Sequence, residues 1–151
     1  MLRRILDLYP QMTGIVFDSS NELRSPASPI DTEDRCSFAS GNFFDSVPEG
    51  ADAYLLCGVL HDWHDERAAV ILCNCREALP KNGRLLIIET IVPETDSASF
   101  SKLLDINMLV MTSGRERTKS EFYLLLSRAG FRIKRITPTL APHSIIEAVP
   151  T

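Results

Sequence analysis

Tyr54-Leu-Leu-Cys-Gly-Val-Leu-His-Asp-Trp-His-Asp-Glu66 is the stretch from which the fold of this 151-residue chain can be inferred. Its first residues form an apolar run that predicts a buried strand. Its last residues gather two histidines, three acids and the only tryptophan. In an open α/β sheet, ligands bind beyond the carboxyl ends of the strands. The stretch therefore predicts a site at the end of this strand, with His61 as the candidate general base.

The segments around this strand alternate between helix and strand patterns. Helices are predicted at residues 1–9, 64–79, 100–111 and 118–129, and strands at residues 13–18, 36–40, 53–57, 84–91, 131–137 and 144–149. Residues 19–35 are predicted to be a loop. The apolar run at 84–91 is typical of a central parallel strand that is buried on both faces. The last two strands are expected to pair antiparallel at the sheet edge. The pattern predicts a single α/β domain over residues 1–151, with a mainly parallel sheet.

Composition narrows the possible partners of the chain. Hydrophobic residues make up 44% and charged residues 24%, as in ordinary globular domains. The net charge of −4 argues against nucleic acid, because phosphate binders usually carry a basic patch. No apolar run approaches the ~20 residues that span a bilayer. The four cysteines form no CxxC pair, which indicates buried free thiols in a reducing compartment. We expect a cytoplasmic protein.

Polar residues occur where several predicted strands end. Asp18 and Asn42 follow two strands, Glu89 lies late in a third, and His61 follows a fourth. If these strands are parallel, all four side chains line one crevice, in which an acid could hold a diol such as a ribose. Plainer interpretations remain open, because Asp18 also suits a turn and His61 a helix cap. Glu116 lies between two arginines and also suits a salt-bridged loop, whereas Glu89 in a buried strand needs a partner.

Two other patterns are ambiguous by themselves. His61 and His64 have HxxH spacing, but a metal site requires further ligands and supporting groups, so no metal is predicted. Met108 and Met111 fall on the apolar stripe of residues 100–111, where methionines usually belong to the core. Methionines also line adaptable pockets for aromatic ligands.

Several motifs follow one another in a defined order. They are His61-Asp-Trp-His-Asp-Glu66, Ala78-Leu-Pro-x-x-Gly83, Glu89, Gly114-Arg-Glu-Arg-Thr118, Glu121-Phe and Ala129-Gly-Phe131. This series resembles the S-adenosylmethionine-dependent O-methyltransferases of the caffeate and hydroxyneurosporene type, from about Leu2 to Val149. The resemblance implies the Rossmann-like fold of class I methyltransferases, and methyl transfer to a hydroxyl of a small, aromatic molecule.

The resemblance also implies roles for individual residues. His61 matches the general base, and Glu89 and Glu116 match the acids that orient it. Asp18 matches the acid that holds the cofactor ribose. The remaining implied contacts are to the cofactor from Asn42, Phe43 and the Cys57 backbone carbonyl, and to the substrate from Asp62, Asn107 and Met108. Asn42 replaces the family's usual aspartate, and Cys57 its usual lysine.

One departure from the family concerns the start of the chain. The family carries a strand and a glycine-rich turn before the first helix, and before them a helical domain that builds a dimer. Here Met1 falls inside the first helix, so we expect a truncated carboxyl-terminal piece that binds cofactor weakly, with a homodimeric full-length parent. The alternatives are an inactive fragment or one half of a split enzyme. A third is an NAD-type nucleotide-binding protein, in which His61, Glu89 and Glu116 have no role.

Overall fold

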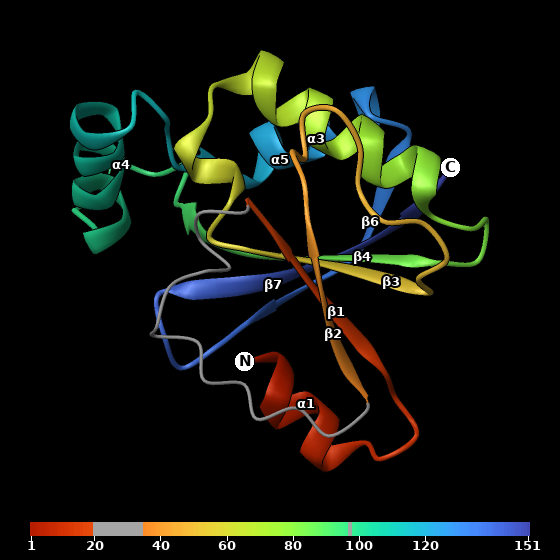
Figure 1. The fold of residues 1–151 in the computed structure, drawn as a ribbon. Coiled ribbons are helices and arrows are strands. Elements are labelled where there is room, and N and C mark those ends of the chain that lie inside the picture. The colour runs from red at the N-terminus through yellow and green to blue at the C-terminus, as the bar shows by residue number, and fades with distance from the viewer. Residues whose placement is uncertain (20–34, 97) are drawn as a thin grey trace. The chain divides into compact units, whose positions relative to one another are not determined.

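The structure is a computed structural model that describes residues 1–19, 35–96 and 98–151 (Figure 1). These residues form two compact units, residues 1–48 and residues 49–151. Most of the predicted loop at 19–35 lies outside the described residues. The prediction of a single domain over residues 1–151 stays a prediction.

Unit 1 contains helix α1 (Leu2–Leu8) and the strands β1 (Gly14–Asp18) and β2 (Cys36–Ser40). The two strands pair in parallel, with Asp18 opposite Ser40. Their carboxyl ends therefore lie side by side, and the Gly41 amide donates a hydrogen bond to the Asp18 carbonyl at 3.1 Å. The Arg35 guanidinium donates to the carbonyls of Leu6 and Met12, which fastens the end of α1 to the turn before β1.

Unit 2 is a mixed five-stranded sheet with helices on it. Its elements are β3 (Ala53–Cys57), the 3₁₀ helix η1 (Leu60–Asp62), α3 (Asp65–Ala78), β4 (Arg84–Val92), α4 (Phe100–Met111), β5 (Arg117–Thr118), α5 (Lys119–Arg128), β6 (Phe131–Pro138) and β7 (His143–Pro150). β4 pairs in parallel with β3 and β5, and antiparallel with β7. The antiparallel pair of β6 and β7 is confirmed, with β6 at the edge. The α/β prediction is confirmed.

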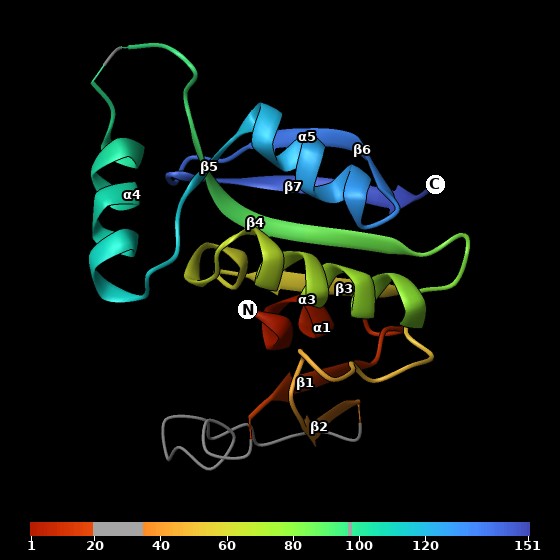
Figure 2. The ribbon, with the colours of Figure 1, turned by 90° about the horizontal axis from the view of Figure 1, so that it is seen from above.

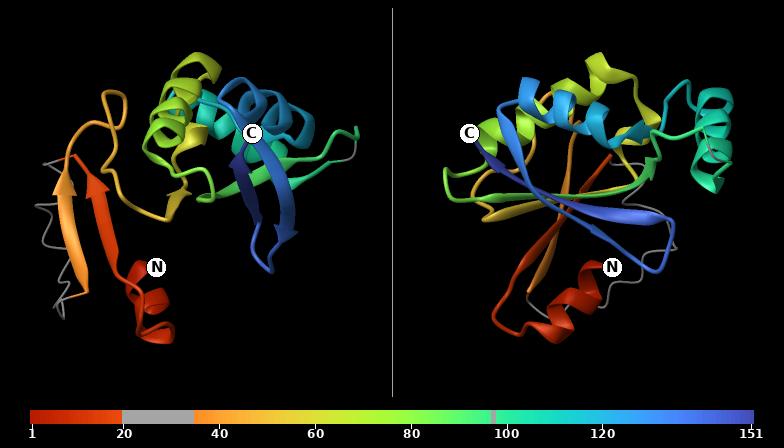
Figure 3. Two further views of the ribbon diagram at one scale, coloured as in Figure 1. Left: turned by 90° about the vertical axis from the view of Figure 1, so that its right-hand side faces the viewer. Right: turned by 180° about the vertical axis from the view of Figure 1, so that it is seen from behind.

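The core of unit 2 lies between the sheet and two helices. Helices α3 and α5 lie on the same face of the sheet (Figures 1 and 3). Each large apolar side chain buried there stabilises the fold by roughly 1.5–3 kcal/mol. The fully buried side chains include Ala68, Ile71, Leu72 and Cys75 on α3, Phe122, Leu125 and Leu126 on α5, and Leu85, Ile87, Ile146 and Ala148 on the strands.

The prediction that β4 is buried on both faces is wrong for one of the two faces. Leu85 and Ile87 are fully buried, whereas Leu86 and Ile88, which alternate with them, are only half-buried. The helices of unit 2 cover one face of the sheet, and on the other face Leu86 lies among charged residues such as Arg84.

Helix α4 forms where the apolar stripe predicts it, but its side chains are not buried. Within α4, Phe100 is 60%, Leu103 64% and Met111 71% exposed. The helix lies beyond the carboxyl end of β4, away from α3 and α5 (Figure 2). Helical spacing therefore predicted the secondary structure correctly, while burial depends on what a helix packs against. Among the described residues, no helix could cross a membrane.

The cysteines are free, but they differ in burial. Cys75 is fully buried, and this burial raises the pKa of its thiol to about 12. Cys57 and Cys73 are exposed, so the prediction of buried thiols is wrong for them. Cys73 is two residues from Cys75 on α3, and this spacing places it on another face of the helix.

Candidate active site

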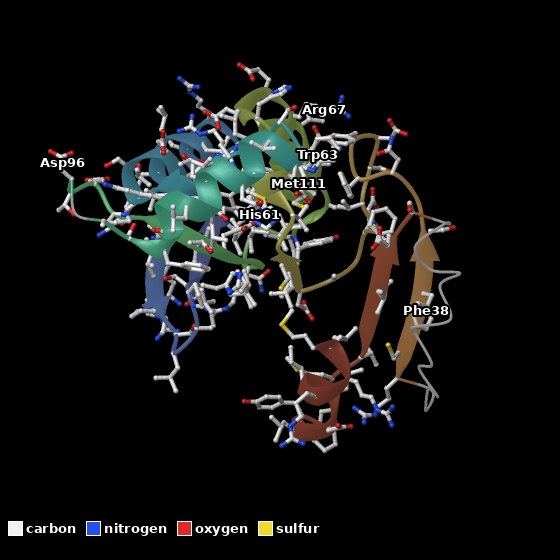
Figure 4. All side chains as sticks on the ribbon, turned by 90° about the vertical axis from the view of Figure 1, so that its left-hand side faces the viewer. Phe38, His61, Trp63, Arg67, Asp96 and Met111 are labelled. Atoms are coloured by element: carbon white, nitrogen blue, oxygen red, sulfur yellow. The ribbon has the colours of Figure 1, made fainter. Side chains whose placement is uncertain are left out.

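A sharp turn after β3 places His61 at the carboxyl end of the sheet (Figure 4). Gly58 adopts a φ of 63°, a left-handed conformation that glycine reaches without steric cost. Its amide still donates to the carbonyl of Ile88 on β4 at 3.1 Å. The chain then forms η1, so that His61 lies one turn beyond the end of the strand.

Glu89 on β4 holds this turn and the imidazole together. Its side chain is fully buried, and its Oε1 accepts hydrogen bonds from the Val59 amide at 3.0 Å and the Leu60 amide at 2.8 Å. Its Oε2 lies 2.8 Å from His61 Nδ1. Hydrogen bonds of this kind offset the cost of burying a carboxylate. A carboxylate that accepts from Nδ1–H leaves the lone pair of the imidazole on Nε2.

Glu116 is the second buried acid beside His61. It is 5% exposed, and its Oε1 lies 3.9 Å from His61 Nδ1. Its Oε2 is buried without a hydrogen-bond partner in the described part of the chain. Burial raises the pKa of Glu116 to about 7, and the charges of Glu89 and Asp105 add to this rise, while His61 and Arg117 oppose it. The Glu116 amide donates to Asp105 Oδ1 on α4 at 2.8 Å.

The environment of His61 favours its protonated form. The hydrogen bond to Glu89 raises the imidazole pKa above 6.5, and the charges of Glu89, Glu116 and Asp62 add to this, against the effect of burial. His61 Nε2 lies 3.6 Å from Asp62 Oδ1, and the His61 side chain is 21% exposed. This arrangement can accept a proton at Nε2 and stabilise the imidazolium that results.

The loop of residues 114–117 packs directly against the turn that carries His61. A Cβ on Gly114 would lie 2.0 Å from the His61 carbonyl oxygen and 2.6 Å from the Asp62 carbonyl carbon, so only glycine fits there. The Arg115 amide donates to the His61 carbonyl at 2.8 Å. The Arg117 guanidinium, 1% exposed, reaches the same turn with its side chain.

Sequence reasoning assigned no role to Gly114, Arg117 or Asp105. The first two belong to the motif at 114–118, but only its glutamate was singled out. A charged residue in a polar motif normally predicts exposure, and nothing in the spacing shows that this arginine is buried. The hydrogen bond from the Glu116 amide to Asp105 joins segments separated by 11 residues, which no local pattern reveals.

The predicted cofactor residues of unit 1 lie at the carboxyl ends of β1 and β2. Asp18 ends β1 and is half-buried. The Asn42 side chain is already engaged within its own loop, accepting from the Phe44 amide at 3.1 Å and donating to Asp45 at 3.0 Å. Phe43 is half-buried, and its ring packs edge-on against Phe44 at 4.8 Å between centroids. Their cofactor roles stay predictions.

The other predicted contacts belong to unit 2. Cys57 is exposed at the end of β3, and Asp62 lies beside His61 Nε2. On α4, Asn107 is exposed and Met108 half-buried. The roles of these four residues stay predictions, as do the catalytic roles of the three that the structure brings together, His61, Glu89 and Glu116.

The same three residues also satisfy the spacing for a metal ion. One ligand atom from each of His61, Glu89 and Glu116 lies within 4.8 Å of the others. His61 Nδ1 and Glu89 are, however, already hydrogen-bonded to each other, and Glu89 also accepts two amides. An ion would have to displace these bonds. His64 is outside this group, since its Nδ1 lies 2.9 Å from Glu66 at the surface. The expectation of no metal stays a prediction.

Comparison with known proteins identifies relatives along the whole chain. Residues 1–132 match a family model described as an O-methyltransferase domain. The phenazine O-methyltransferase of Lysobacter antibioticus is 40% identical over 153 residues, covering 99% of this chain and 45% of that protein.

Solved structures agree with this sequence similarity. The SAH-bound form of a methyltransferase in calicheamicin biosynthesis superposes with a TM-score of 0.89 at 36% identity, over 99% of this chain and 45% of that one. Human N-acetylserotonin methyltransferase in complex with SAM gives a TM-score of 0.90 at 34% identity, over 99% and 44%. The chain thus spans less than half the length of the relatives it matches.

Proposed function

Because this chain belongs to the family of O-methyltransferase domains, we propose that it supplies the general base for S-adenosylmethionine-dependent methyl transfer to a hydroxyl of a small aromatic molecule. Its relatives support this, since one is a phenazine O-methyltransferase and two were solved with SAM or SAH. The observation that carries the proposal is the buried Glu89 carboxylate, which binds both the turn carrying His61 and its imidazole.

The residues of unit 1 fit such a cofactor. The carboxylate of the half-buried Asp18, at the end of β1, suits the two hydroxyls of a ribose. The half-buried ring of Phe43 offers apolar surface to an adenine. The Asn42 amide is satisfied within its loop, so we propose that Asn42 shapes the loop. In unit 2, we propose a contact from the Cys57 backbone carbonyl. S-adenosylmethionine, when bound, supplies a methyl group made electrophilic by its positively charged sulfur.

The proposed chemistry of this chain is a proton transfer. The acceptor hydroxyl gives its proton to His61 Nε2, since Nδ1 is engaged by Glu89. The imidazole then becomes positively charged, and the Glu89 carboxylate at 2.8 Å and Glu116 at 3.9 Å stabilise that charge. General-base assistance of this kind typically accelerates a reaction about 10²–10⁴-fold. We propose that Asp62, Asn107 and Met108 contact the acceptor, with Met108 as the adaptable surface for an aromatic ring.

Three proposals concern the whole protein. We propose a homodimer for the full-length parent, from the family resemblance. We propose that nucleic acid is not a partner, since the net charge is −4. We propose a cytoplasmic location, which suits four cysteines that are all free.

The test compares two histidines of one motif. His61→Gln should lower methyl transfer from radiolabelled S-adenosylmethionine to a hydroxyphenazine by about 100-fold or more, with an unchanged circular dichroism spectrum. His64→Gln is the matched control, because His64 is exposed and pairs only with Glu66 among the contacts described for it. Unchanged turnover in the His61 variant would rule out the base role.

A further inference from the structure

We propose that Arg117 is a positioning residue, which fixes His61 for proton transfer by fastening the histidine turn, residues 60–65, to the sheet. The proposal rests on the proposed function, because it assumes that His61 is the base. It concerns a residue with no hydrogen bond to the imidazole among the described contacts, whose positioning effect passes through the backbone of the turn.

The Arg117 side chain bonds the histidine turn at three residues. Its Nη1 donates to the Leu60 carbonyl at 2.8 Å, and its Nη2 donates to the Trp63 carbonyl at 2.7 Å. Its Nε donates to Asp65 Oδ1 at 2.9 Å. One guanidinium therefore holds the residue before His61, a residue two positions after it, and the first residue of α3.

The Arg117 side chain makes these contacts away from solvent. The side chain is 1% exposed and is among the largest fully buried side chains of the described residues. A buried charge is costly unless it is paired and hydrogen-bonded. Here the carboxylate of Asp65 supplies the opposite charge, and the carbonyls of Leu60 and Trp63 supply two further acceptors. Removing the guanidinium would remove one hydrogen bond from each of those two carbonyls.

A second, independent observation concerns the backbone around Arg117. The Arg115 amide donates to the His61 carbonyl at 2.8 Å, and Gly114 allows the two backbones to touch. Arg117 itself begins β5 and lies opposite Ile91 on β4, two residues beyond Glu89. Strand β4, which carries Glu89, therefore pairs with the end of the loop of residues 114–117. That loop contacts the histidine turn from the other side. His61 is held by its imidazole on Glu89 and by its backbone on residues 115–117.

A lysine would not replace this arginine. The guanidinium is a planar fork whose donors point in fixed directions, which lets it reach three acceptors at once. An ammonium group carries the same charge but is a compact point charge on a flexible stem. Arg117→Lys therefore separates a role in positioning from a purely electrostatic effect on the imidazole.

The experiment follows the His61 imidazole by long-range ¹H–¹⁵N NMR in the full chain. In the wild type we expect one dominant Nδ1–H tautomer at high pH. Arg117→Lys and Arg117→Met should both convert this to a mixture of tautomers and shift the imidazole titration by at least half a pH unit. In the methyl-transfer assay both should lower kcat at least 10-fold and leave KM for S-adenosylmethionine unchanged. A wild-type tautomer, titration and kcat in Arg117→Lys would overturn the proposal.

A milder variant covers the case in which Arg117→Met fails to fold. Asp65→Asn removes the anionic partner of Arg117 from a residue that is 40% exposed. It should mix the His61 tautomers and shift the His61 titration by a smaller amount than the Arg117 variants do, and wild-type tautomers and titration in this variant would count against the proposal. Glu66→Gln is its control, because Glu66 is the neighbouring acid and is 84% exposed.

Arg115→Met is the control for the loop. Arg115 flanks Glu116 on the other side. Its guanidinium bonds Glu121 and lies 4.0 Å from Asp65, but it makes none of the hydrogen bonds to the Leu60 and Trp63 carbonyls that Arg117 makes. The NMR readout needs no turnover, so the two hypotheses can fail separately. Altered tautomers with an inactive wild type would refute the methyl-transfer function and support the positioning role. An active wild type with unaltered Arg117 variants would refute the positioning role alone.

Discussion

Glu89 binds His61 through one carboxylate oxygen and the turn that carries His61 through the other. Oε2 lies 2.8 Å from His61 Nδ1, while Oε1 accepts the Val59 and Leu60 amides at 3.0 and 2.8 Å. The orientation of the imidazole and the shape of its backbone are therefore set by the same fully buried group.

The first prediction concerns the pH dependence of activity. His61 must be neutral to accept a proton, and its raised pKa places the acidic limb of the rate profile above 6.5. Glu89→Gln removes the carboxylate that raises this pKa, so the limb should move to lower pH, and kcat should fall by at least about 10-fold. Initial rates between pH 5 and 9 measure both effects. If the acidic limb of the rate profile stays at the same pH in Glu89→Gln, Glu89 does not raise the His61 pKa. Glu94→Gln, at an exposed position, is the control.

The second prediction concerns the stability of the fold and Glu116. Burial raises the Glu116 pKa from 4.5 to about 7, so the folded state binds a proton more tightly than the unfolded chain. The stability that this gives is present below pH 4.5 and is lost as the pH rises through about 7. The glutamine of Glu116→Gln stays neutral. From pH 5 to pH 8, the free energy of unfolding of this variant should therefore rise by on the order of 1 kcal/mol relative to that of the wild type. Urea unfolding of both proteins at pH 5 and pH 8 measures this change. The same difference in unfolding free energy at both pH values would contradict the prediction.

The third prediction concerns the contact between Gly114 and the histidine turn. Gly114→Ala places a Cβ 2.0 Å from the His61 carbonyl oxygen, and backbone atoms cannot move away as a side chain can. We expect a loss of about 1–3 kcal/mol of stability, together with reduced kcat. Gly14→Ala is the control, since the atoms nearest to its Cβ would be those of the flexible Leu2 side chain. Equal losses in the two variants, measured by thermal unfolding, would argue against a special contact at Gly114.

The fourth prediction concerns the start of α5. Thr118 Oγ1 accepts from the Glu121 amide at 3.3 Å, and Glu121 Oε2 accepts from the Thr118 amide at 2.8 Å. Thr118→Ala removes one side of this capping box and should cost about 1 kcal/mol of unfolding free energy. Thr118→Ser keeps the hydroxyl and should restore most of it. Chemical denaturation of the three proteins decides the outcome, and an alanine variant as stable as the wild type would contradict it.

Local patterns predicted those parts of the molecule that depend on neighbouring residues. The capping box at Thr118 and Glu121 is confirmed because a cap is decided by side chains three positions apart. The pairing of β6 with β7 is confirmed because a short connection favours antiparallel neighbours. The exposure of Leu103 and Met111 was not foreseen, because a helical stripe shows which side chains share a face but not whether anything covers it.

By itself, the sequence determined the alternation of helices and strands, and the carboxyl-end position of His61, since these follow from hydrophobic spacing and turn chemistry along neighbouring residues. Only the tertiary structure decided that β7 enters the sheet beside β4, that Glu89 and Glu116 approach one imidazole, and that Arg117 is buried against the histidine turn. These features join residues that lie between 28 positions apart, for His61 and Glu89, and 63 positions apart, for Leu85 and Ala148. Contacts over such separations depend on strand order and on the pairing of buried charges, which no local pattern contains.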